Sequence, residues 1–181
     1  MSEIFNTNND SGDYNITKFP VGKTFDVKID DNTVWVKDIL LELNQDADEK
    51  NPQQYLEETS IELELEIVKK FKNELSEYFL VTGEIHTRYK TKCVKTLKDM
   101  TMDLTVDLKA CFIDLSLEDI DQFKDQTETF IDNDLYELYF YSERKITLKE
   151  VVSELIYLNL DQYPSLDASD DMEDLQTSLK Q

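Results

Sequence analysis

The sequence predicts an α+β fold in which an antiparallel β-meander, either open or curled towards a barrel, is packed by two helices. Three segments, 61–67, 77–93 and 100–112, alternate apolar and polar residues with the period of a half-buried strand. Two others, 36–43 and 147–158, repeat apolar residues at the spacing of an amphipathic helix. Short connections between the three strands favour antiparallel pairing, with one apolar and one polar face.

The chain of 181 residues is long enough for one ordinary domain with short appendages. Residues 1–18 are rich in Asn, Asp and Ser and have few apolar positions, which predicts a flexible N-terminal segment. The periodic segments lie in residues 19–164, which we expect to form a single α+β domain. Residues 165–181 are acidic and predict a disordered tail.

The chain is strongly acidic, with 40 Asp and Glu against 19 Lys and Arg and a formal net charge of -21. That excess disfavours non-specific binding to phosphate backbones, which requires clustered Lys and Arg, and it favours basic partners such as ribosomal proteins. No stretch is typical of a signal peptide or of a membrane span, and the two cysteines suit a reducing compartment. We therefore expect a cytoplasmic protein.

The start of the domain is expected to supply one strand and one helix before the meander. Thr24–Ile29 has the pattern of a short strand, and Asn32 or Thr33 can cap the helix that follows. Trp35 lies off the apolar stripe of that helix, which consists of Val36, Ile39, Leu40 and Leu43. Residues 44–55 break the periodicity and predict a loop.

The second and third strands of the meander align when apolar residues are placed opposite apolar ones. Pairing Cys93 with Met100 does this and predicts a hairpin with residues 94–99 at its tip. The pairs on its apolar face are then Thr91–Met102, Tyr89–Leu104, Thr87–Val106 and Ile85–Leu108. Its other face is predicted to be charge-complementary, with the pairs Lys92–Thr101, Lys90–Asp103, Arg88–Thr105, His86–Asp107 and Glu84–Lys109.

The C-terminal part is expected to form a loop, a strand and a helix. Residues 114–134 are acidic and weakly periodic, which predicts an exposed loop, and residues 135–141 predict a short strand. Thr147 and Glu150 have the spacing of a capping box, in which each side chain bonds the other residue's backbone. The apolar face of the helix would consist of Leu148, Val151, Val152, Leu155 and either Tyr157 or Leu158.

The hairpin gathers basic residues in an acidic protein. One interpretation is a solvated sheet face, balanced by Asp103 and Asp107 on the next strand. The other is a contact surface for RNA or for an acidic partner. The candidate interaction surface consists of Arg88, Lys90, Lys92, Cys93, Lys95, Thr96 and Lys98.

The single histidine and the two cysteines are not expected to form a chemical site. His86 opposite an Asp is typical of a surface pair, because the pattern places no nucleophile beside it. Cys93 faces away from His86, and Cys111 falls on the polar face without a partner, whereas zinc needs three or four ligands. The three glycines are too widely spaced for a phosphate-binding loop. We therefore assign no catalytic, cofactor-binding or metal-binding residue.

Three landmarks occur in order along the second half of the chain. Val81-Thr-Gly-Glu-Ile85 leads into the box Cys93-Val-Lys-Thr-Leu97, and a strand of alternating pattern follows. The helix that begins at Ile146 then leads to Leu158-Asn-Leu-Asp-Gln-Tyr-Pro164. In this order and spacing the chain resembles the bacterial large ribosomal RNA subunit accumulation proteins, the YceD family, over residues 60–168 and more weakly back to Phe19.

The chain departs from the family pattern at its cysteines. Many members carry Cys-x-Arg-Cys in the box and a second cysteine pair near the C-terminus, a pattern that suggests zinc. Here Thr96 takes the second box position, and residues 163–168 contain no cysteine. The chain resembles the branch with a Cys-Val-x-Thr-Leu box, so no metal is carried over from the cysteine-rich members.

The resemblance implies a role in the synthesis, processing or stability of the large-subunit (23S) ribosomal RNA, without catalytic residues. We therefore expect a non-enzymatic accessory factor that contacts a basic ribosomal protein or precursor RNA and needs no cofactor. The alternative is a generic acidic adaptor or nucleic-acid mimic that occupies basic surfaces. A hydrolase with a carboxylate-bound metal is least favoured, since it requires Asp and Glu side chains that converge in a pocket.

Overall fold

The computed structural model describes residues 10–17 and 19–165 and has the predicted α+β class. Two helices lie in these ranges, α1 (Val34–Asn44) and α2 (Leu148–Asn159), with 3-10 helices at Pro52–Tyr55 and Ile120–Gln122. The strands there are β1 (Asp13–Asn15), β2 (Thr24–Asp30), β3 (Ser60–Lys72), β4 (Ser76–Lys92), β5 (Asp99–Asp114), β6 (Glu128–Ile131), β7 (Asp134–Tyr141) and β8 (Lys145–Thr147).

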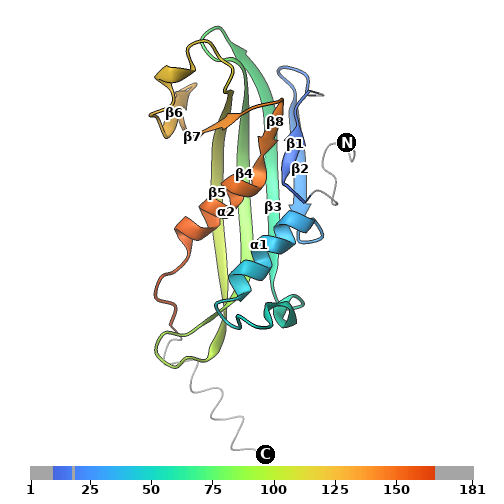
Figure 1. Ribbon diagram of the computed structural model, residues 1–181, viewed down its shortest axis with the longest axis vertical. Coiled ribbons are helices and arrows are strands. Elements are labelled where there is room, and N and C mark those ends of the chain that lie inside the picture. Colours follow the sequence, from blue (N-terminus) through green and yellow to red (C-terminus); the bar gives the residue numbers. More distant parts are fainter. Residues whose placement is uncertain (1–9, 18, 166–181) are drawn as a thin grey trace, which may run out of the picture.

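The strands of the described ranges form a six-stranded sheet, in the order β2-β3-β4-β5-β7-β6, and a separate pair of β1 with β8. Neighbours in the large sheet pair antiparallel, except that β5 and β7 are parallel. Because β2 and β6 lie at the two ends of the order, the sheet is open and does not close into a barrel. Both helices cross the same face of the long strands (Figure 1), which we call the inner face; the other is the outer face.

The main core lies between the helices and the inner face. The predicted apolar stripe of α1 is confirmed, since all four of its residues are buried against the sheet. Burial of each such side chain is worth roughly 1.5–3 kcal/mol, so the stripe is enough to hold the helix in place. Trp35, which lies off the stripe, is also buried, and its Nε1–H donates to the hydroxyl of Tyr14 at 2.9 Å.

Part of the segment that the sequence predicts to be flexible is ordered. Asp13–Asn15 pairs with β8, and Tyr14 and Ile16 are only 2% and 4% exposed. The prediction was therefore wrong for residues 10–17, because a polar segment gains order when a distant strand and Trp35 supply its partners. Residues 1–9 and the predicted disordered tail from 166 onwards lie outside the described residues.

The N-terminus of α2 also differs from its prediction. Thr147 is the N-cap residue, but its hydroxyl bonds Asp13 Oδ1 at 2.6 Å and makes no capping bond. The N–H of Leu148 donates to the carbonyl of Gly12 at 2.9 Å instead. The capping box is thus replaced by contacts with the N-terminal strand. At the other end Ile156 completes the apolar face, while Tyr157 and Leu158 are exposed.

The β4–β5 hairpin forms, but its register differs from the prediction by two residues. Met100 pairs with Thr91 and not with Cys93, and Tyr89 pairs with Met102. Cys93 instead begins the turn: its N–H donates to the carbonyl of Lys98 at 2.9 Å, and its own carbonyl accepts from the N–H of Leu97 at 2.8 Å. Since a shift of two residues leaves every side chain on its face, the faces are correct although the partners are not.

The outer face is not polar throughout. We predicted residues 114–134 to form an exposed loop. At the end of the sheet near β6, this connection instead packs Ile120 and Ile131 onto the outer face. The second core formed there buries Cys111 completely, although we predicted it on a polar surface. This second core consists of Leu75, Tyr78, Leu80, Cys111, Ile113, Ile120, Ile131 and Leu138.

Candidate interaction surface

The observed register brings acidic residues of three strands together on the outer face. Glu64 lies opposite Glu84, and Glu84 lies opposite Asp107, so three exposed carboxylates occupy adjacent positions across β3, β4 and β5. Glu62 and Glu66 flank Glu64 on the same face of β3, because alternate residues of a strand share a face. We call Glu62, Glu64, Glu66, Glu84 and Asp107 the acidic band.

The acidic band is only partly neutralised. Lys28 of β2 forms an ion pair with Glu64, and this hydrogen bond and charge hold the pKa of the Glu64 carboxyl below its ordinary value. The Nε2 atom of His86 lies 3.3 Å from Glu84 Oε2. No ion pair joins Asp107 in the part of the chain that the structure describes. The centre of the outer face therefore keeps a negative charge.

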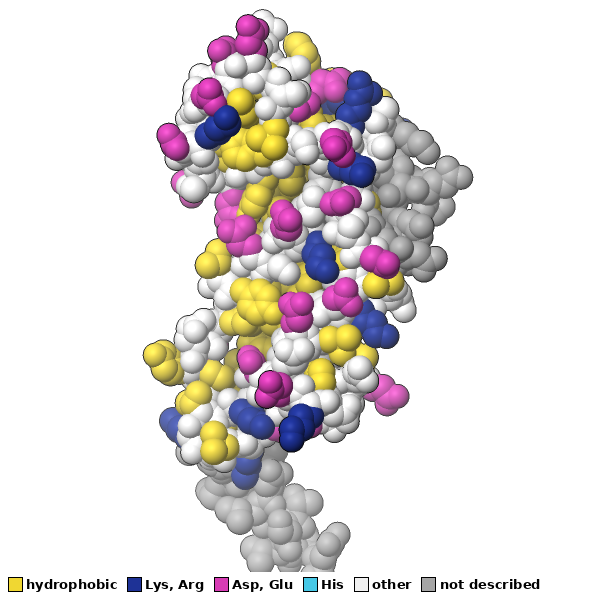
Figure 2. Space-filling view, in the orientation of Figure 1, with side chains coloured by type: hydrophobic (Ala, Val, Ile, Leu, Met, Phe, Trp, Pro, Cys, Tyr) yellow, Lys and Arg dark blue, Asp and Glu magenta, His cyan; other side chains and the backbone are white. Residues whose placement is uncertain are grey.

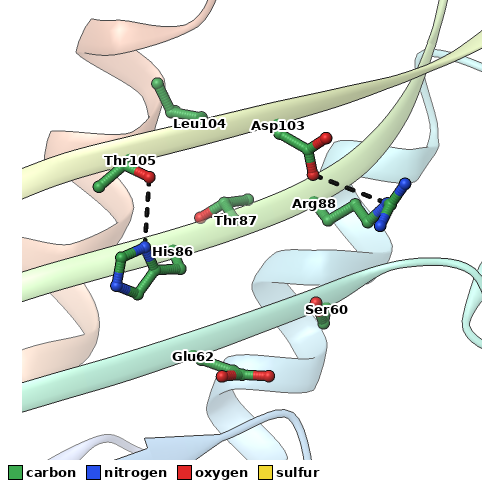
Figure 3. A pocket seen from close by; sticks show the side chains of 8 residues that line it. All are labelled: Ser60, Glu62, His86, Thr87, Arg88, Asp103, Leu104 and Thr105. Carbon is green, nitrogen blue, oxygen red and sulfur yellow. Dashed lines mark hydrogen bonds and ion pairs between the residues drawn. The ribbon is translucent and has the colours of Figure 1, made fainter.

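A shallow hollow of about 260 Å³ adjoins the acidic band (Figure 3). His86 Nδ1 lies 3.2 Å from the hydroxyl of Thr105, so the predicted pairing of His86 with Asp107 is wrong. Arg88 and Asp103 form an ion pair at 3.6 Å across the hollow, where the prediction paired Arg88 with Thr105. The hollow is lined by Ser60, Glu62, His86, Thr87, Arg88, Asp103, Leu104 and Thr105.

The residues of the predicted basic row have different surroundings in the structure. Lys90 is only 14% exposed, its Nζ bonds Glu58 Oε2 at 2.6 Å, and it lies 5.8 Å from the ring centre of Tyr55. Arg88 is paired as described above, and Lys92 is exposed. Cys93 is completely buried, so its assignment to an interaction surface was wrong. The structure thus favours the charge-balanced interpretation for the middle of the row.

The hairpin tip carries the other predicted basic residues beside exposed apolar ones. Lys95, Thr96 and Lys98 are exposed, and Leu97 is 72% exposed. Tyr163, which is 79% exposed, is brought to the tip because the N–H of Val94 donates to the carbonyl of Pro164 at 2.9 Å. Figure 2 shows basic and hydrophobic side chains together at the end of the molecule that holds the tip.

Two groups of residues here were missed in the sequence. The acidic band was missed because the predicted register placed Glu84 opposite Lys109 and Asp107 opposite His86; the alternation of Glu62, Glu64 and Glu66 was the available signal. The approach of Tyr163 to the tip had no signal in the local pattern, since the two segments are far apart along the chain.

Neither cysteine is placed for reaction with solvent. Burial raises the pKa of the Cys111 thiol to about 12, and Cys93 is also buried. Within residues 10–17 and 19–165, no three His, Cys, Asp or Glu side chains are grouped so that they could hold a metal ion. The helices of these ranges are too short or too polar to cross a membrane.

The fold and this surface define a class: an α+β protein with an open, mostly antiparallel sheet, two helices on its inner face and an acidic band on its outer face. Comparison of the chain with known protein families, with curated proteins and with solved structures found no match. The resemblance to the YceD family therefore stays a prediction.

Proposed function

We propose that this chain is a non-enzymatic accessory factor that supports the accumulation of 23S ribosomal RNA by holding a basic ribosomal protein on its outer face. The acidic band carries the proposal. Like charges directly opposite each other in a sheet are destabilising, and a row of Lys or Arg side chains from a partner would relieve that repulsion. The resemblance to the YceD family supplies the ribosomal context.

A protein partner is favoured over RNA by the state of the basic side chains. Binding to phosphates requires cations that are free to replace counterions. Arg88 and Lys90 already have carboxylate partners on the same surface. The exposed lysines at the tip are few beside the acidic band and a net charge of -21.

The three adjacent charges at the centre of the acidic band can be removed without changing the shape of the side chains. In the triple variant Glu64→Gln, Glu84→Gln and Asp107→Asn, we expect affinity capture from a lysate to lose ribosomal proteins that the wild type retains after ribonuclease treatment. A matched control removes three exposed charges elsewhere, in Glu57→Gln, Glu118→Gln and Asp125→Asn, and should retain them. Equal capture by both variants would contradict the acidic band as the binding surface.

The ribosomal context has its own test. Depletion of the protein is expected to lower the level of 23S-type RNA, and an unchanged level would count against the proposal. In a sucrose gradient the protein should sediment with large-subunit precursors. A generic acidic adaptor or nucleic-acid mimic would instead sediment with its own target, away from those precursors.

A further inference from the structure

One long strand edge in the sheet has no partner along most of its length. β5 extends over Asp99–Asp114, but β7 pairs only with Ala110–Asp114. Along residues 99–108 the structure shows backbone pairing to β4 on one side and none on the other, as far as the described chain reaches. In Figure 1 this stretch forms the lower margin of the sheet on the side away from β2.

The hydrogen-bond pattern of the hairpin tells which backbone groups face the free edge. Residues opposite each other in an antiparallel pair alternate between bonded and non-bonded positions. The bond from the N–H of Cys93 to the carbonyl of Lys98 places these two at a bonded position, so the even-numbered residues of β5 bond to β4. The N–H and C=O groups that point towards the free edge are those of Thr101, Asp103, Thr105 and Asp107.

The segment that follows α2 does not close this edge. The segment reaches the tip, where Pro164 accepts a bond from Val94 and not from β5. In Figure 1 it descends to the tip on the side of β5 away from β4. No backbone bond joins residues 160–165 to β5, so this segment does not pair with the edge.

The two faces beside the edge differ in character. On the outer face an added strand would meet Asp103 and Asp107, the latter a member of the acidic band. On the inner face it would meet Met102 and Leu104, which are only partly buried, and exposed Leu158 of α2 lies on the same side of the sheet. A segment that fits both faces alternates basic residues with apolar ones.

We propose that the free edge of β5 binds an extended segment of a basic partner by antiparallel strand addition, with Lys or Arg side chains on the outer face and apolar side chains on the inner face. This inference rests on the proposed function, because the extended segment belongs to the basic partner that the acidic band is proposed to bind. Backbone bonds to the outward groups of β5 supply affinity, and the alternating side chains supply specificity. A second copy of this chain fits less well, because pairing β5 with β5 would bring two acidic bands together.

A peptide of alternating Lys and Val residues, long enough to span residues 101–108, tests the inference. In the bound state, amide hydrogen exchange followed by NMR should slow at the outward N–H groups, including those of Thr105 and Asp107. In an antiparallel arrangement the peptide residues bonded to β5 carry outer-face side chains, so their amides are those of the lysines. N-methylation of the lysine amides should weaken binding at least about tenfold, whereas methylation of the valine amides should leave it unchanged.

Proline substitution at the edge gives an independent test. Thr105→Pro removes an outward N–H without breaking a bond to β4 and should abolish peptide binding. Thr105→Val keeps the N–H and should bind as the wild type does. The matched control is Thr24→Pro on β2, the strand at the opposite edge of the sheet. This variant should also bind the peptide as the wild type does. Thermal unfolding confirms that each variant is folded.

The outcomes separate this inference from the proposed function. Strand addition is overturned if both methylated peptides bind like the parent, if protection appears only on β2, or if the Thr105→Pro variant binds the peptide normally. A concentration-dependent dimer that Thr105→Pro abolishes would overturn it in favour of a second copy. If the edge of β5 does not bind the peptide while the chain still sediments with large-subunit precursors, the proposed function stands. If the peptide binds as expected but depletion leaves 23S-type RNA unchanged, the proposed function fails and the edge site stands.

Discussion

Glu84 and Asp107 lie directly opposite each other on the outer face of the β4–β5 hairpin, and Glu64 lies on the other side of Glu84. Adjacent carboxylates repel each other, so the folded chain carries a row of acids that lowers its own stability. A binding surface for a basic partner explains why such a row is present, and it leads to a prediction in which stability and binding change in opposite directions.

Glu84→Gln is expected to raise the free energy of unfolding by roughly 0.2–1 kcal/mol, because it removes repulsion on both sides. The same change should weaken binding of a basic partner. Denaturant titration should show that the stability gain shrinks at high salt, where exposed charges are screened. Glu57→Gln, at an exposed loop position, is the control and should change stability little. A less stable Glu84→Gln variant would show that the repulsion is not significant.

Tyr14→Phe is expected to lower the free energy of unfolding by about 1–3 kcal/mol. The substitution removes the acceptor of the Trp35 Nε1–H and leaves a buried donor without its bond. Chemical denaturation measures the difference. Tyr163→Phe loses a hydroxyl from an exposed ring and should unfold like the wild type. If the two variants behave alike, the N-terminal strand does not stabilise the domain through this bond.

Gly83→Ala is expected to destabilise the sheet more than Gly22→Ala. Both glycines have positive φ, at 151° and 78°, so both substitutions strain the backbone by about 1–3 kcal/mol. A Cβ at position 83 would also lie 2.0 Å from the carbonyl oxygen of Glu64. A Cβ at position 22 would have no neighbouring heavy atom within 4 Å among the described residues. Thermal unfolding of the two variants compares the clash with strain alone, and equal losses would contradict the close approach of β3 and β4.

Stability is expected to fall as the pH rises from about 10 to about 12. Burial and the charges of Asp114 and Glu77 raise the pKa of Tyr141 from 10.0 to about 12 in the folded chain. Above pH 10 the unfolded chain loses this proton while the folded chain keeps it, so the contribution is complete below pH 10 and is lost as the pH passes the folded value. Tyr141→Phe should reduce the slope of stability against pH in denaturation experiments across this range. An unchanged slope would show that Tyr141 titrates alike in both states.

Much of the architecture could be predicted from local patterns. The strands β2, β3, β4, β5 and β7 and both helices occur where periodicity predicted them, because an amphipathic segment has one conformation that buries its apolar side. The elements that were missed or misjudged depend on distant partners: β1 pairs with β8, and β6 covers the second core. Their sequences are short or acidic and carry no periodic signal of their own.

The candidate site shows the same division. The sequence by itself determined which face of the hairpin each side chain occupies, because a strand's side chains alternate with a period of two. It could not determine the register, since a shift of two residues preserves both faces. Only the tertiary structure decided it: Cys93 turns into the core, Pro164 bonds the tip, and Glu84 therefore lies opposite Asp107 instead of Lys109. That two-residue difference replaces a charge-balanced face by the acidic band.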